Sequence, residues 1–156
     1  MPKVVLDRKV PEFALPATGA QPSWSLAGAA GRKLVIFFYP KDMTSGCTLE
    51  AQGFRDQVAA FRKAGTAIVG ISRDTLASHE KFCLKEKLPY PLLSDSDEKV
   101  CRLFDVIQEK SLYGRKYMGI ERSTFLLDAA GILRREWRKV KVNGHVEEVL
   151  EAAKSL

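Results

Sequence analysis

The three cysteines are the residues in this sequence best suited to do chemistry, and their spacing limits what that chemistry can be. Cys47, Cys83 and Cys101 lie far apart, form no CxxC pair and are accompanied by only two histidines. Such a set is too sparse for a disulfide-rich scaffold and offers few ligands for zinc. We therefore expect no metal and no cofactor, which leaves thiol redox chemistry or inert burial for the cysteines.

Cys47 follows a segment that predicts a strand passing into a helix. Residues 33–39 are a near-continuous apolar run, typical of a strand buried on both faces, and Pro40 ends it. Thr44 and the two residues after it are candidate N-caps, which places Cys47 in or beside the first turn of a helix. Apolar residues at helical spacing and a basic end before a glycine predict that this helix runs to about residue 63.

A thiol at this position needs more than the helix to become reactive. The thiolate is the nucleophile, and a free cysteine with a pKa of ~8.5 is only a few per cent ionised near pH 7. The helix dipole contributes roughly 0.3–1 kcal/mol, or ~2 kcal/mol in a partly buried site, whereas one pKa unit corresponds to about 1.36 kcal/mol. A second positive group should therefore lie beside Cys47.

The remaining pattern predicts an α/β fold around a mixed sheet. Residues 66–72 form a second apolar run, so the two strands and the helix between them predict a βαβ unit with parallel strands. Segments 123–127 and 132–140 predict an antiparallel hairpin, and residues 1–32 an extended segment with a short hairpin. We see no boundary and expect one domain over residues 1–156. The other expected elements are a helix capped at Asp74 and Thr75, a short strand at 92–93, a helix over 100–104, a polar loop over 107–117 and a last helix over 146–155.

Charge and hydropathy restrict the partners. The formal net charge is +6 and the densest basic run, residues 134–141, contains Trp137, which keeps a basic nucleic-acid-binding module open as an alternative. We favour a solvated sheet face and no nucleic-acid partner, because the charge is otherwise scattered and no nucleic-acid motif occurs. No run reaches membrane-spanning length and the first residues lack the apolar core of a signal peptide, so we expect a cytoplasmic protein without a membrane partner.

The segment from Pro40 to Cys47 matches the PxxxTxxC signature of the peroxiredoxins, which are thiol peroxidases with a thioredoxin-like fold. Further segments resemble the bacterioferritin-comigratory or Q-type (BCP/PrxQ) branch, and the similarity covers essentially the whole chain. The resemblance implies a thioredoxin-like central mixed sheet flanked by helices, with an N-terminal hairpin. It also implies that Cys47 is the peroxidatic cysteine, that Pro40 shields it and that Thr44 hydrogen-bonds the thiolate or the peroxide. Arg122, on residue type alone a surface strand residue, matches the active-site arginine of the family and would supply the missing cation.

The sequence departs from much of this branch at the second cysteine. Many members carry the resolving cysteine five positions after the peroxidatic one, where this chain has Gln52. Others carry it in the next helix, at a position that Cys83 resembles, although on residue type alone Cys83 is a small apolar helix residue. We expect Cys101 to be a core residue.

The resemblance implies a peroxidase for hydrogen peroxide and organic hydroperoxides. Cys47 would become a sulfenic acid, form an intramolecular disulfide with Cys83 and be recycled by thioredoxin or glutaredoxin, in a monomeric protein. A disulfide requires Cα atoms about 4.4–6.8 Å apart. Because Cys47 begins one predicted helix and Cys83 lies deep in the next, we expect the reduced pair to be too distant and the first turn of the Cys47 helix to unwind during turnover. An alternative is a protein thiol–disulfide oxidoreductase of the same fold, which predicts a CxxC pair that Cys47 lacks.

Overall fold

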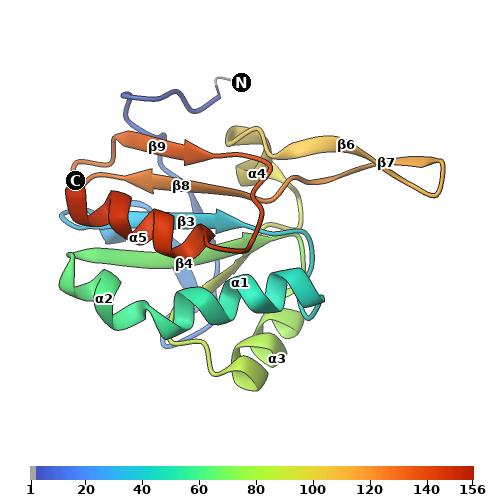
Figure 1. Cartoon of the computed structure of the whole chain (residues 1–156), viewed down its shortest axis with the longest axis horizontal. Helices are drawn as coiled ribbons and strands as arrows, with labels where there is room; N and C mark the ends of the chain where they lie inside the picture. Colours follow the sequence, from blue (N-terminus) through green and yellow to red (C-terminus); the bar gives the residue numbers. More distant parts are fainter. Residues whose placement is uncertain (1–2) are drawn as a thin grey trace.

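The computed structural model describes residues 3–156, which form a five-stranded mixed sheet with helices on both faces (Figure 1). The central strand β3 pairs with β4 in parallel and with β8 in antiparallel orientation. Both the βαβ unit and the late antiparallel hairpin predicted from the sequence are confirmed. In order across the sheet the strands are β5 (Leu92–Ser94), β4 (Thr66–Ser72), β3 (Lys33–Phe38), β8 (Ser123–Leu127) and β9 (Leu133–Trp137).

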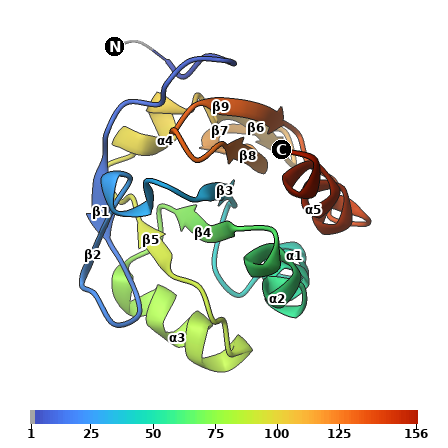
Figure 2. The same ribbon diagram turned by 90° about the vertical axis from the view of Figure 1, so that its left-hand side faces the viewer.

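The helices divide between the two faces of the sheet. In Figure 2, α1, α2 and α5 cover one face, while α4 and a small hairpin of β1 and β2 lie on the other. The bounds are α1 (Ser45–Asp56), α2 (Val58–Lys63), α3 (Leu76–Glu86), α4 (Lys99–Leu103), α5 (His145–Ser155), the 3-10 helix η1 (Ala27–Ala29), β1 (Ala14–Pro16) and β2 (Ser23–Ser25). The thioredoxin-like arrangement and the N-terminal hairpin are therefore as predicted.

Strand β3 is buried on both faces, which explains its continuous apolar sequence. Ile36 and Phe38 pack into a core with the N-terminal segment and α4, whereas Val35 and Phe37 pack into a core with α1, α2 and α5. Successive side chains of a strand point to opposite faces, so such a strand needs apolar residues at every position. Burial of each large side chain stabilises the fold by roughly 1.5–3 kcal/mol, and the end of β3 is a firm support for the loop that follows.

The helix predicted to run from Cys47 to about residue 63 is interrupted, which corrects that prediction. Gln57 leaves helical geometry (φ −105°, ψ 8°) and separates α1 from α2. Because of this break, α2 packs along β4 while α1 packs against α5. At that second contact, a Cβ on Gly53 would lie 2.9 Å from Val146 Cγ2, so only glycine permits this approach.

The polar loop predicted over residues 107–117 is wrong, because this stretch belongs to a hairpin of β6 (Ile107–Leu112) and β7 (Arg115–Ile120). Its turn residues Tyr113 and Gly114 both have positive φ, 50° and 77°, as a two-residue hairpin turn requires. The hairpin projects away from the central sheet (Figure 1), and mainly its base is buried. Polar residues therefore occupy both faces, and the alternation that marks a half-buried strand is missing.

The two apolar cores lie on opposite faces of one sheet. The prediction of one domain over residues 1–156 includes residues 1 and 2, which lie outside the described residues, and it stays a prediction. Within residues 3–156, no helix combines the length and the hydrophobicity that crossing a bilayer requires.

Candidate active site

Cys47 lies in the first turn of α1, at the end of the loop that leaves β3. Thr44 is the N-cap residue in extended backbone (φ −84°, ψ 156°), and Cys47 is only 1% exposed. The first turn contains no acidic residue, so the partial positive charge of its free N–H groups is not offset from within the helix. The sulfur therefore lies in a buried position beside the positive end of the helix.

Arg122 brings a full positive charge to this sulfur. It directly precedes β8, whose residue Ser123 pairs with Phe38 at the end of β3, so the sheet register carries Arg122 to the edge where α1 begins. Its Nη2 donates to Cys47 Sγ at 3.4 Å. The structure therefore places a guanidinium where the energetics of a reactive thiolate require a cation.

Glu50 completes this arrangement and was not predicted from the sequence. It is fully buried one turn after Cys47, and its Oε1 accepts a hydrogen bond of 2.8 Å from Arg122 Nη1. Within the described residues, its Oε2 has no hydrogen-bond partner.

Burial raises the pKa of Glu50 to about 7, although the positive charge of Arg122 acts to lower it. Burial acts to lower the pKa of Arg122, but Glu50 and Cys47 outweigh it and the pKa is raised. The sequence held one sign of this role: Glu50 lies three residues after Cys47 on a predicted helix, a spacing that makes the two side chains neighbours.

Gly46 makes room for the guanidinium. A Cβ at this position would lie 3.1 Å from Arg122 Nη2, closer than ordinary van der Waals contact. The absence of a side chain between Thr44 and Cys47 therefore allows Arg122 to reach the sulfur.

Thr44 and Pro40 lie in the segment expected from the sequence, but the Thr44 hydroxyl has a partner of its own. Its Oγ1 donates to the carbonyl of Lys41 at 2.8 Å, and no hydrogen bond joins it to Cys47 within residues 3–156. Pro40 is half-buried two residues after the end of β3, in the same loop. A hydroxyl whose hydrogen is already donated can still accept one.

The other two cysteines have different surroundings. Cys83 lies in α3, with its Sγ 3.4 Å from Thr18 Oγ1, beside a cavity of about 350 Å³ that Tyr90 also lines. Burial raises the pKa of the Cys83 thiol, against the effect of Thr18. Cys101 is fully buried in the core, as expected, and burial together with Asp95 raises its pKa. All three cysteines are free, and the structure does not join Cys83 to Cys47.

Comparison with known proteins gives consistent likenesses over the whole chain. The AhpC/TSA family profile matches residues 6–136. Peroxiredoxin Bcp of Xanthomonas campestris is 49% identical over 158 residues, covering 99% of this chain and 98% of that protein. A structure of Xanthomonas campestris Peroxiredoxin Q superposes with a TM-score of 0.87 at 50% identity, over 92% of this chain and 90% of that one. A PrxQ mutant of Xylella fastidiosa superposes with a TM-score of 0.92 at 36% identity, over 99% and 98%.

The thioredoxin-like sheet and the buried cysteine beside an arginine, together with these likenesses, define a thiol peroxidase. The chain belongs to the AhpC/TSA family and, within it, to the peroxiredoxins of the Bcp or Q type.

Proposed function

We propose that Cys47 is the peroxidatic residue and that it reduces hydrogen peroxide and organic hydroperoxides. Its thiolate attacks one peroxide oxygen, a sulfur–oxygen bond forms as the oxygen–oxygen bond breaks, and the departing oxygen takes up a proton to leave as water or an alcohol. Cys47 is left as a sulfenic acid. The observation that carries this proposal is the contact of Arg122 with both Cys47 and Glu50 at the start of α1.

The protein's larger contribution lies in the transition state. Full ionisation raises the thiolate fraction at most about thirtyfold near pH 7, and nucleophilicity falls as a thiol becomes more acidic. Donors aimed at the peroxide oxygens stabilise the charge that develops when the oxygen–oxygen bond lengthens, and Arg122 and the N–H groups before Cys47 are such donors. Because Thr44 donates its hydrogen to Lys41, its free lone pair accepts the O–H of the peroxide. Pro40 shields the sulfur from bulk water.

Cys83 is the resolving residue in this proposal. Its thiol attacks the sulfenic sulfur of Cys47, a disulfide forms within one chain, and water leaves. The surroundings of the cysteines support the assignment, because Cys83 lies beside a cavity whereas Cys101 is sealed in the core. In addition, structures of Xanthomonas campestris Peroxiredoxin Q have been determined with either of two cysteines changed to serine, and those cysteines are as far apart in sequence as Cys47 and Cys83.

The substrates and partners follow from this cycle. A study of the Xanthomonas campestris bacterioferritin comigratory protein, 48% identical to this chain, concerns its alkyl peroxide reduction activity, which supports organic hydroperoxides as substrates. We propose thioredoxin, or glutaredoxin, as the dithiol reductant, and a monomer as the working form. Three free cysteines fit a reducing compartment, and we propose the cytoplasm.

One experiment tests the cycle. Consumption of hydrogen peroxide and cumene hydroperoxide is measured with and without thioredoxin and its reductase, for the wild type and for Cys47→Ser, Cys83→Ser and Cys101→Ser. Cys47→Ser should abolish consumption, and Cys83→Ser should permit one turnover but block recycling by thioredoxin. Cys101→Ser is the matched control and should resemble the wild type.

Mass spectrometry of the oxidised protein identifies the disulfide. A bond between Cys47 and Cys83 within one chain is expected. A bond from Cys47 only to Cys101 would exclude Cys83 as the resolving residue, and a bond between chains would replace the monomeric cycle with a dimeric one. Oligonucleotide binding indifferent to Cys47→Ser, without peroxide consumption, would favour the nucleic-acid alternative instead.

A further inference from the structure

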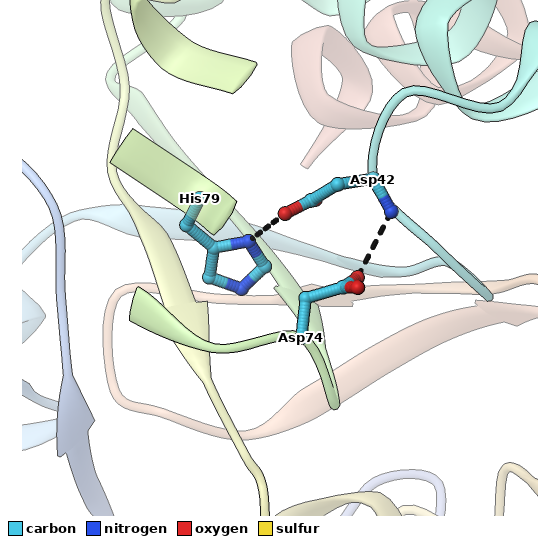
Figure 3. Close-up of side chains that lie close together, drawn as sticks. All are labelled: Asp42, Asp74 and His79. Atoms are coloured by element: carbon cyan, nitrogen blue, oxygen red, sulfur yellow. Dashed lines mark hydrogen bonds and ion pairs between the residues drawn. The ribbon is translucent and has the colours of Figure 1, made fainter. Parts of the chain in front are cut away.

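A second polar cluster lies outside the peroxide site and joins two segments that each lead to a cysteine. Asp42, in the loop between β3 and α1, contacts His79 of α3, with Asp74 alongside (Figure 3). The Asp42 Oδ2 to His79 Nδ1 distance is 2.7 Å, and both side chains are withdrawn from solvent, with exposures of 1% and 0%.

Hydrogen bonds hold both side chains of the pair in place. His79 Nε2 lies 2.9 Å from the carbonyl of Leu93, which can only accept, so Nε2 carries a hydrogen. Asp42 Oδ2 accepts from Ser78 Oγ at 2.8 Å, and Oδ1 accepts from Tyr39 Oη at 2.6 Å. Asp42 Oδ2 and His79 Nδ1 share one further hydrogen bond. The arrangement is therefore a buried Asp42–His79 pair in which the polar atoms of both side chains have partners.

The same contacts argue against a metal in this cluster. A cation would have to replace the 2.7 Å contact between Asp42 and His79. The remaining carboxylate is also occupied, since Asp74 Oδ2 accepts from the Asp42 backbone N–H at 2.9 Å and from Ser72 Oγ at 2.6 Å. Within the described residues, the one buried side-chain polar atom that lacks a partner is in Glu50, in the peroxide site. The cluster is satisfied by itself, which fits a positioning role.

Its location connects it to the two cysteines. Asp42 lies in the loop that enters the helix of Cys47, and His79 lies one helical turn before Cys83. His79 and Phe82 are the only buried residues of α3. The contact of His79 with Asp42 is therefore the buried polar contact that joins α3 to the loop before α1. The other end of α3 is tied by hydrogen bonds from Gln52 and Arg55 of α1 to Glu86, which are only partly buried.

We propose that Asp42 and His79 are positioning residues that hold the loop before α1 against α3 in the reduced protein, and that their contact opens when Cys47 and Cys83 pair. This inference rests on the resolving role proposed for Cys83. The two sulfurs contact different residues, Cys47 beside Arg122 and Cys83 beside Thr18, so each gives up its present contact when they pair.

The consequence is a choice between two fates of the sulfenic acid. While the contact between Asp42 and His79 holds, Cys47 remains a sulfenic acid. A second hydroperoxide molecule can then oxidise it to a sulfinic acid, and that hydroperoxide is reduced to water or an alcohol. When the contact opens, the Cys83 thiol displaces water and forms the disulfide. The Asp42–His79 pair thereby sets the ratio of disulfide to sulfinic acid at a given peroxide concentration.

The test compares wild type with the double variant Asp42→Asn/His79→Gln, which removes both titratable groups together and so leaves neither one buried without its partner. Disulfide formation after one equivalent of hydrogen peroxide is followed by rapid quenching and mass spectrometry, and the Cys47–Cys83 equilibrium is measured against dithiothreitol. We expect about tenfold faster disulfide formation, a similar shift of the equilibrium toward the disulfide, and less sulfinic acid at high peroxide. Val149→Ala, a core truncation in α5, is the matched control, because it lowers stability without moving these ratios.

A folded double variant whose rate and equilibrium stay within twofold of wild type would overturn the proposal. If the double variant does not fold, Ser78→Ala weakens the same pair by removing one donor to Asp42, and its lack of effect would overturn the proposal equally. If the wild type forms no Cys47–Cys83 disulfide at all, the resolving role fails together with this inference. A normal disulfide with unchanged ratios refutes the inference alone.

Discussion

Removing the guanidinium of Arg122 should slow the reaction with peroxide far more than it reduces the amount of thiolate. Arg122 Nη2 lies 3.4 Å from the sulfur, and the arginine side chain is only 16% exposed. Two unit charges about 4 Å apart interact by ~4 kcal/mol at an effective dielectric constant of about 20, against ~1 kcal/mol in water. An interaction of this size acts both on the thiolate and on the charge that develops on the peroxide.

The two contributions have different limits. Loss of ground-state stabilisation lowers the thiolate fraction about thirtyfold near pH 7 if the pKa returns to that of a free cysteine, and the effect vanishes once the pH is high enough to ionise the thiol. Loss of a donor to the developing charge costs about 10²–10³ in rate and persists at high pH. We therefore expect Arg122→Ala to lower the second-order rate constant for peroxide by about 10²–10³ where the thiol is fully ionised.

The assay compares two electrophiles on the same sulfur. Stopped-flow kinetics gives the rate with hydrogen peroxide, and alkylation by iodoacetamide across pH reports the thiolate alone. Because Arg122→Ala leaves Glu50 buried without a cation, the substitution is also made together with Glu50→Gln. Arg135→Ala, which removes an exposed arginine of β9, is the control. Equal losses of peroxide and iodoacetamide reactivity would refute the division between thiolate and transition state.

Two further predictions concern the neighbours of Arg122. Because burial raises the pKa of Glu50 from 4.5 to about 7, its contribution to stability is complete below pH 4.5 and is lost as the pH rises through 7, a change of up to roughly 3 kcal/mol. Urea unfolding from pH 5 to 8 should show this decline in the wild type but not in Glu50→Gln, and equal slopes would contradict it. Gly46→Ala should displace the guanidinium by a few tenths of an ångström and slow peroxide reduction about fivefold, while alanine improves helix propensity by about 1 kcal/mol. A lower melting temperature with an unchanged peroxide rate would contradict this second prediction.

The sequence alone predicted the position of Cys47, because that position depends on local patterns. The apolar run at 33–39 and the N-cap candidates at 44–46 placed Cys47 in or beside the first turn of α1, because strand burial and helix starts are decided by neighbouring residues. The need for a cation beside Cys47 also followed from energetics. That the cation is Arg122 came from the family resemblance, since spacing along the chain does not show which distant residue the sheet register brings there.

The features that were missed depend on contacts between distant segments. Glu50 is a charged residue on a helix, and nothing local shows that it is buried against Arg122. The buried pair of Asp42 and His79 joins two elements whose relative position is fixed only by the complete fold. The β6–β7 hairpin lacks the alternation of a half-buried strand because it projects from the molecule, so its turn at Gly114 was the one local sign of it.

The antiparallel pairing of β3 with β8 has a consequence for how this chain tolerates change. Cys47 and Arg122 reach one another because Phe38 and Ser123 are neighbours across the sheet, whatever the length of chain between them. Insertions or deletions at the tip of the β6–β7 arm should leave the distance from sulfur to guanidinium intact. Slippage of β8 by a single position would instead turn its side chains to the opposite face and carry Arg122 away from the thiolate.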